Sequence, residues 1–296
     1  MSSIELKSRA KINLSIDVLG REPNGYHLVE MIMQTINLYD IIRIKDIPHG
    51  DIIIKTDSSE IPIDSDNIVY RAVNLLKNQF SIDKGVEIFI QKNIPVAAGM
   101  AGGSSNAAAA LVGLNKLWKL NLSEKELQDI GFKLGADVPF CISGSAALAE
   151  GLGEKLTSIK GLPQHINILI CKPELFVSTK EVYEGLNLNK IQNRPNNDLL
   201  LSHLECGDVK FVAENMANVL EEVTSKKYKE INEIKKVIMM NNALGSMMSG
   251  SGPTVFGLFE NNEDASKCKD ELIKKYRQVY IVNSSEKGVE ISGELK

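Results

Sequence analysis

The segment Pro95-Val96-Ala97-Ala98-Gly99-Met100-Ala101-Gly102-Gly103-Ser104-Ser105 decides the fold class of this 296-residue chain. Alternating apolar residues at 86, 88 and 90 predict a strand before it, and the alanine-rich stretch after it predicts a helix that ends near Trp118. Glycines at such a junction let backbone N–H groups converge on a ligand, and a helix N-terminus adds a positive dipole. The segment therefore predicts a phosphate-binding loop. The alternative is a tight turn in which Ser104 or Ser105 only caps the helix.

Familiar phosphate loops of other kinds are absent from the sequence. No stretch matches GxxxxGK[ST], the segment 95–105 does not fit GxGxxG, and the HRD and DFG motifs of protein kinases are missing. The sequence thus excludes the P-loop, the dinucleotide fingerprint and the protein-kinase signature.

The N-terminal residues 4–18 alternate between apolar and polar side chains. This period of two predicts a long strand or hairpin with one buried face. Lys11 and Asn13 share its polar face, so they can point together into a cleft, whereas solvent exposure is expected for Glu5 and Lys7. Asp137 lies between Gly135, which is expected to end a helix, and Pro139, so a turn is predicted there.

The rest of the chain mixes strands and helices without strict alternation, which favours an α+β fold. Ser123 and Ser178 each open a capping-box sequence, and helical spacing runs from 208 to 224. A second glycine-rich turn, 245–252, precedes an apolar strand. We place a domain boundary between 155 and 163, which gives domains 1–157 and 158–296.

The composition is that of a soluble globular protein, with 43% hydrophobic and 24% charged residues and a net charge of −4. Because there is no basic surplus, nucleic acid is not expected as a partner. No apolar run reaches the roughly 18 residues of a membrane span, so no membrane partner is expected. Four cysteines without CxxC spacing are expected to be buried thiols in a reducing, cytoplasmic protein: Cys141, Cys171, Cys206 and Cys268.

Three motifs, in order, resemble the GHMP kinase superfamily, which is named for galactokinase, homoserine kinase, mevalonate kinase and phosphomevalonate kinase. They are Lys11 and Asn13 on the first strand, the loop 95–105, and Met248-Ser249-Gly250-Ser251-Gly252-Pro253-Thr254. The resemblance implies a two-domain α+β fold with an N-terminal half like ribosomal S5 domain 2 and a ferredoxin-like C-terminal half. It also implies an enzyme that transfers a phosphoryl group from ATP, with Mg²⁺, to a small-molecule alcohol.

Within that superfamily the chain is most similar to members that phosphorylate a cytidine diphosphate-linked methylerythritol in the non-mevalonate isoprenoid pathway. The shared stretches are Gly25-Tyr26-His27, Gly135-Ala136-Asp137-Val138-Pro139 and Asn197-Asp198-Leu199. Two alternatives stay open: another small-molecule kinase of the homoserine or mevalonate type, and a non-catalytic ATP-binding regulator on the same fold. Gly25-Tyr26-His27 argues against another small-molecule kinase, because homoserine and mevalonate have no base to stack. Intact Lys11 and Asp137 argue against a non-catalytic regulator.

The resemblance also assigns expected roles to single residues. Asp137 would be the catalytic base with Lys11 beside it, and residues 95–105 would bind ATP. Substrate would contact Asn13, Tyr26, His27 and Tyr183: the two tyrosines would stack on the cytosine ring and His27 would hydrogen-bond its edge. No residue identifies itself as a metal ligand; Asp137, Ser104 and Ser105 are the nearest candidates. We expect a monomer or a weak homodimer.

Overall fold

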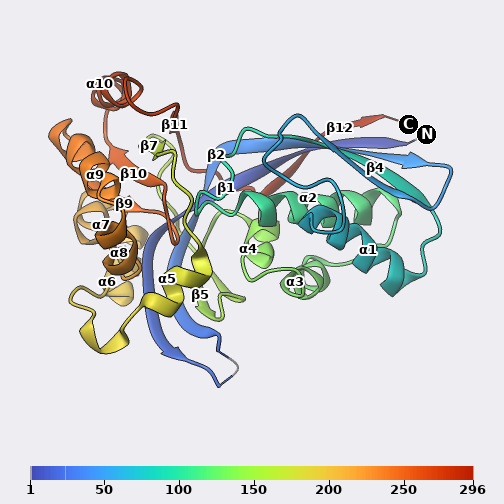
Figure 1. Cartoon of the computed structure of the whole chain (residues 1–296), viewed down its shortest axis with the longest axis horizontal. Coiled ribbons are helices and arrows are strands. Elements are labelled where there is room, and N and C mark those ends of the chain that lie inside the picture. The colour runs from blue at the N-terminus through green and yellow to red at the C-terminus, as the bar shows by residue number, and fades with distance from the viewer. Residues whose placement is uncertain (1, 24, 296) are drawn as a thin grey trace.

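Strands β1 (Ser3–Arg21) and β2 (His27–Ile47) form a long antiparallel hairpin through the middle of the molecule (Figure 1). The computed structural model describes residues 2–23 and 25–295. Both faces of β1 are buried from Ser8 to Val18, so the predicted polar face is not solvated over this stretch. The loop before the alanine-rich helix packs against it, and the backbone N–H of Lys11 donates to the Met100 carbonyl at 3.2 Å.

The hairpin belongs to a mixed sheet, which has eight strands within the described residues. Its main order is β12-β1-β2-β4-β3, with β5 and β8 added to β2 and β1 and β6 added to β5. The remaining strands are β3 (Ile52–Thr56), β4 (Gly85–Gln91), β5 (Ala146–Gly151), β6 (Lys155–Ile159), β8 (Ala217–Asn218) and β12 (Val289–Leu295).

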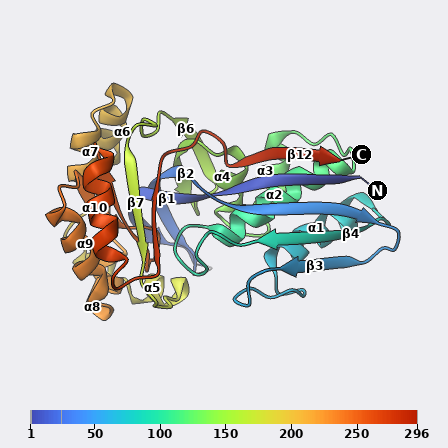
Figure 2. The same cartoon turned by 90° about the horizontal axis from the view of Figure 1, so that it is seen from above.

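Four helices cover one face of this sheet (Figure 2): α1 (Ile68–Phe80), α2 (Gly102–Leu117), α3 (Glu124–Phe132) and α4 (Val138–Ser143). The alanines at 107–110 of α2 are fully buried in the same core as Ile42 and Ile44 of β2. Short side chains allow this close approach between helix and sheet. Ser123 forms the predicted capping box with Glu126 at the start of α3.

The second half is built on a four-stranded antiparallel sheet of order β11-β7-β10-β9. Its strands are β7 (Asn167–Lys172), β9 (Gly245–Met248), β10 (Val255–Phe259) and β11 (Gln278–Val282). The helices of this half are α5 (Thr179–Gly185), α6 (Asn197–Cys206), α7 (Val209–Asn215), α8 (Glu221–Lys227), α9 (Glu230–Met240) and α10 (Asn262–Leu272), with a 3₁₀ turn at Leu188–Lys190.

The prediction of one helical run from 208 to 224 is wrong. The run divides into α7 and α8, because β8 lies between them and pairs in parallel with Ser15 and Ile16 of β1. The Asn218 side chain then accepts the N–H of Leu220 at 3.0 Å. A tertiary contact therefore overrides the local helical spacing.

The two halves share a hydrophobic core. Ile12 and Leu14 of β1 are fully buried in one cluster with Ile168 and Ile170 of β7 and Phe256 of β10. The last strand, β12, also returns to the first sheet and pairs with β1, so both chain ends lie at the same end of the molecule (Figure 1). The predicted α+β class is confirmed, and the boundary at 157 stays a prediction.

The described helices include none that is long and apolar enough to cross a membrane. Three of the four cysteines are buried as predicted, but Cys206 is exposed, because it is the last residue of α6 on the surface.

Candidate active site

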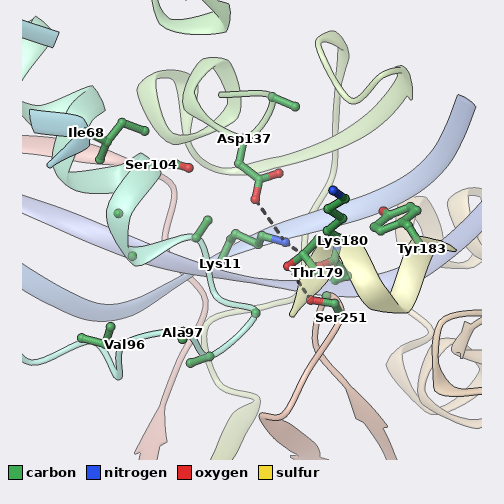
Figure 3. Close-up of a pocket in the computed structure, with 18 of the residues that line it drawn as sticks. Lys11, Ile68, Val96, Ala97, Ser104, Asp137, Thr179, Lys180, Tyr183 and Ser251 are labelled. Atoms are coloured by element: carbon green, nitrogen blue, oxygen red, sulfur yellow. Dashed lines mark hydrogen bonds and ion pairs between the residues drawn. The ribbon is translucent and has the colours of Figure 1, made fainter. Parts of the chain in front are cut away.

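A cavity of about 1110 Å³ lies where the two halves meet (Figure 3). One wall is the loop before α2, and a second is β1 with the residue before α4. The start of α1, α5 and the turn at Gly250 and Ser251 also line the cavity. Most of the predicted site residues line it: Lys11, Asn13, Tyr26, His27, Pro95, Val96, Ala97, Ala98, Gly99, Ala101, Gly102, Gly103, Ser104, Asp137 and Tyr183.

The glycine-rich loop has a left-handed backbone at every second residue: φ is 51° at Ala97, 72° at Gly99 and 55° at Ala101. Left-handed positions alternating in this way turn successive N–H groups toward one side, which makes an anion-binding concavity. Ala101 precedes α2 and offers no side-chain cap. The first-turn amides of α2 are thus left without an acceptor from the capping residue, at an N-terminus that opens into the cavity.

The two predicted site residues Met100 and Ser105 do not line the cavity. Met100 is 1% exposed and packs in the core shared by the halves, and Ser105 is fully buried. The Ser105 hydroxyl donates to the Arg9 carbonyl at 2.7 Å, which fastens α2 to β1. Neither Ser104 nor Ser105 acts as the helix cap, because both lie inside the first turn of α2.

The loop before α2 and the turn after β9 touch backbone to backbone. A Cβ on Gly99 would lie 2.3 Å from the Ser249 carbonyl oxygen, and one on Gly250 would lie 2.8 Å from the Gly99 carbonyl oxygen. The Ser249 hydroxyl donates to the Gly99 carbonyl at 3.0 Å. Glycine is therefore required at both positions, and the second and third sequence motifs flank one site.

Lys11 and Asp137 face each other on the wall of the cavity, with Lys11 Nζ 3.8 Å from Asp137 Oδ2 (Figure 3). Lys11 is only 4% exposed and donates to Asn13 Oδ1 at 2.6 Å. Asp137 lies on the predicted turn directly before α4, yet its side chain makes no capping hydrogen bond. Its carboxylate is directed at Lys11 and the cavity instead.

The charge of Asp137 also acts on the hydroxyl of Tyr183 and on the thiol of Cys141. Burial raises the pKa of the Tyr183 hydroxyl, and the nearby Asp137 carboxylate raises it further. The pKa of the Cys141 thiol is raised by the same two causes in the same order. Both groups are therefore neutral at pH 7, and neither competes with Asp137 as a base.

Three ring side chains line the same cavity: Tyr26, His27 and Tyr183. The rings of His27 and Tyr183 are 5.1 Å apart between centroids and tilted by 42°, and Tyr26 is 64% exposed. Burial lowers the pKa of His27 below its ordinary value of 6.5, and the positive charge of Arg21 lowers it further. The His27 imidazole is therefore neutral at pH 7.

Several cavity residues were not anticipated from the sequence. Lys92 and Asn106 line the cavity beside the loop, and their positions, three residues before Pro95 and directly after Ser105, were an available signal. On the other side, Thr179 and Ser251 hydroxyls lie 2.9 Å apart and join α5 to the third motif. Ser251 lies in the third sequence motif, whereas nothing local in the sequence marks Thr179 as a cavity residue.

The described residues contain no group of three or more His, Cys, Asp or Glu side chains that could hold a metal ion. A cation bound mainly through ligand phosphates needs only one or two protein oxygens. The Asp137 carboxylate and the Ser104 hydroxyl both line the cavity and can supply them, whereas Ser105 cannot.

Family models for GHMP kinases match this chain twice. The GHMP kinases N terminal domain matches residues 67–145, and the GHMP kinases C terminal model matches residues 200–278. The solved homoserine kinase from Cytophaga hutchinsonii superposes with a TM-score of 0.78 at 20% identity, over 98% of this chain and 97% of its own, which shows the shared fold. The chain therefore belongs to the GHMP kinases and is an ATP-dependent kinase.

Closer relatives carry one common name. A 4-diphosphocytidyl-2-C-methyl-D-erythritol kinase of Clostridioides difficile (strain 630) is 69% identical over 100% of both chains. One from Caldicellulosiruptor bescii is 50% identical over 96% of this chain and 99% of its own. A crystal structure of 4-(cytidine 5'-diphospho)-2C-methyl-D-erythritol kinase superposes with a TM-score of 0.81 at 27% identity, over 95% of this chain and 99% of that one. These findings confirm the resemblance within the superfamily that the sequence motifs indicate.

Proposed function

We propose that the protein transfers the γ-phosphoryl group of ATP to the 2-hydroxyl of 4-diphosphocytidyl-2-C-methyl-D-erythritol, in the non-mevalonate isoprenoid pathway. The observation that carries the proposal is the position of the Lys11–Asp137 pair, in the same cavity as the glycine-rich loop and the His27–Tyr183 ring pair. The cavity volume of about 1110 Å³ exceeds the roughly 300–1,000 Å³ of a typical single-ligand pocket.

In this proposal the ATP phosphates bind at residues 95–104, where backbone N–H groups and the N-terminus of α2 attract negative charge. Met100 and Ser105 support this loop from the core side through the contacts with β1 described above. Mg²⁺, held by the ATP phosphates with Ser104 and Asp137, would offset phosphate charge when bound.

Phosphoryl transfer needs a base near the attacking hydroxyl and a cation near the transferred group. Asp137 accepts the proton of the substrate 2-hydroxyl while the hydroxyl oxygen attacks the γ-phosphorus of ATP. The bond between the γ-phosphorus and the oxygen that bridges it to the β-phosphate then breaks, and ADP is released. Lys11 lies beside Asp137 and offsets charge on the moving group. Asn13 holds the Lys11 ammonium in place at 2.6 Å.

In the same proposal the cytosine ring binds beside Tyr26, His27 and Tyr183. A neutral imidazole donates from one nitrogen and accepts at the other, so His27 can read the edge of the base while the tyrosines contact its faces. The protein would act in the cytoplasm as a monomer or weak homodimer, without a nucleic-acid partner.

Coupled ADP release tests the proposal with three alcohols at equal concentration. We expect turnover of 4-diphosphocytidyl-2-C-methyl-D-erythritol and none of homoserine or mevalonate, because the latter two have no base for the ring pair. Comparable turnover of either simple alcohol contradicts the assigned substrate and leaves the kinase family standing.

A further inference from the structure

Asp40 is a fully buried carboxylate on β2 that does not line the cavity. Its Oδ1 accepts the backbone N–H groups of Asn93 at 2.7 Å and Ile94 at 2.8 Å. Its Oδ2 accepts the Asn106 side-chain amide at 2.8 Å and the Lys92 ammonium. Two hydrogen bonds on each oxygen fill the roughly four acceptor positions of an ionised carboxylate.

The four partners of Asp40 flank the glycine-rich loop. Asn93 and Ile94 directly precede Pro95, and Asn106 directly follows Ser105 in the first turns of α2. One side chain on a third segment therefore holds both ends of the loop 95–105. The distance between those ends sets the curvature of the loop and the direction of its N–H groups.

Asp40 also fixes a cation at the nucleotide side of the cavity. Lys92 lines the cavity although its side chain is only 8% exposed. A Cβ on Gly102 would lie 3.4 Å from Lys92 Nζ, so the ammonium lies beside the first residue of α2. A paired anion stabilises a buried ammonium, and Asp40 is that anion for Lys92.

We propose that Asp40 is a positioning residue for nucleotide binding: it holds Lys92, Asn106 and the backbone before Pro95, and so fixes the loop in the form that receives the phosphates. The inference rests on the proposed function only where it places ATP phosphates on this loop. The competing explanation is a buried ion pair that contributes stability alone. A half-buried ion pair elsewhere in the chain is available for comparison: Arg9 Nη2 lies 2.5 Å from Glu290 Oε2, and neither residue lines the cavity.

Calorimetric titration with ATP and Mg²⁺, without second substrate, separates the two explanations. Asp40→Asn keeps the size of the side chain but turns an NH₂ group toward two donors. We expect the Kd for ATP to rise by about tenfold or more, because Lys92 and the two ends of the loop are no longer held in the form that receives the phosphates, while the KM for the cytidine substrate stays unchanged. The control Glu290→Gln should lower the melting temperature and leave the ATP Kd unaltered.

A second variant covers the case in which Asp40→Asn does not fold. Asp40→Asn/Lys92→Met removes both charges together, so no buried charge stays unpaired. Its ATP Kd should also rise by about tenfold or more. An ATP Kd equal to that of the wild type in either folded variant overturns the proposal. ADP release by the wild-type protein is measured in parallel, so failure to use the cytidine substrate counts against the proposed function and not against the role of Asp40.

Discussion

Lys11 carries a full charge at 4% exposure, and a buried ammonium is stable only with close polar partners. The hydrogen bond to Asn13 is short at 2.6 Å, but the contact with Asp137 is 3.8 Å, longer than a direct N–H···O bond. Lys11 is thus held by Asn13 and not by Asp137. The Asp137 carboxylate keeps its oxygens available for a substrate hydroxyl while it still feels the positive charge.

Replacement of Asp137 by Asn tests its role as the base. We expect kcat to fall by about 10²–10⁴-fold, the usual contribution of a positioned general base, while ATP binding is largely retained. Steady-state kinetics and ATP titration measure the two effects. The matched control is Asp129→Asn, the same change at a 62% exposed side chain on α3, which should leave kcat unchanged. Near-normal kcat in Asp137→Asn would show that positioning alone drives the transfer.

Replacement of His27 by Ala tests recognition of the cytosine edge. Loss of one partner of a buried hydrogen bond should lower kcat/KM for the cytidine substrate by about tenfold to a hundredfold. Tyr26→Phe keeps the ring and should have almost no effect, and exposed His165→Ala is the control for removal of an imidazole. A stable His27→Ala protein with unaltered kcat/KM would exclude the edge-reading role.

The lowered pKa of His27 predicts a pH dependence for the same step. Burial and Arg21 both favour the neutral ring, so His27 stays neutral as pH falls to its ordinary pKa of 6.5 and gains its proton only at lower pH. Protonation removes the acceptor nitrogen, so kcat/KM for the cytidine substrate should fall on the acid side of pH 6.5. In Arg21→Gln one of the two causes is gone, and the acid limb should move toward higher pH. NMR titration of His27 in both proteins gives the pKa directly, and identical values would refute the assigned cause.

At the scale of the element, the N-terminus of α2 can be tested with a side chain added at Gly103, where the folded protein has room for it. A Cβ on Gly103 would meet only Ile68 Cγ2 at 3.7 Å, an ordinary contact, and Gly103 lines the cavity. Gly103→Val should therefore fold but obstruct the approach of phosphates to the backbone and weaken ATP binding sharply. Gly293→Val on β12, where the added Cβ has Glu5 Cβ at 3.8 Å, is the control. An unchanged ATP Kd in folded Gly103→Val would move the phosphates off this turn.

Elements with local signals were predictable from the sequence, and contacts between distant segments were not. The strand, loop and helix around 95–105 and the capping box at Ser123 depend on neighbours within a few residues, and the structure contains them. Asp40 lies 52 residues before Lys92, and in the sequence it is only one polar residue in a strand. The division of the expected 208–224 helix has the same cause, since β8 exists through its pairing with β1. Burial of the polar face of β1 was likewise not predictable from the sequence, because it results from packing. The closeness of Lys11 and Asn13 was predictable from the alternation of polar and apolar residues.

At the scale of the whole molecule, the last strand belongs to the first half. β12 pairs with β1 from Ser3 to Ser8, and Glu290 on it neutralises the buried Arg9 guanidinium. The core cluster around Ile12 also contains residues of β7 and β10. Residues 1–157 alone would thus expose an edge of β1, an unpaired guanidinium and an apolar surface.

We therefore expect a protein of residues 1–157 not to unfold cooperatively, even though it contains the loop and Asp137. A circular permutant is the control, with residues 161–295 placed before residues 2–160 through a short linker, so that the new ends lie in the loop after β6. The old ends are adjacent, since Ser3 pairs with Leu295, so the permutant keeps every strand pairing and should unfold in one transition and bind ATP. Circular dichroism in urea measures cooperativity in both proteins. A cooperative transition in the fragment, at the midpoint of the intact chain, would show that the first 157 residues are an independent domain and that β12 only covers its edge.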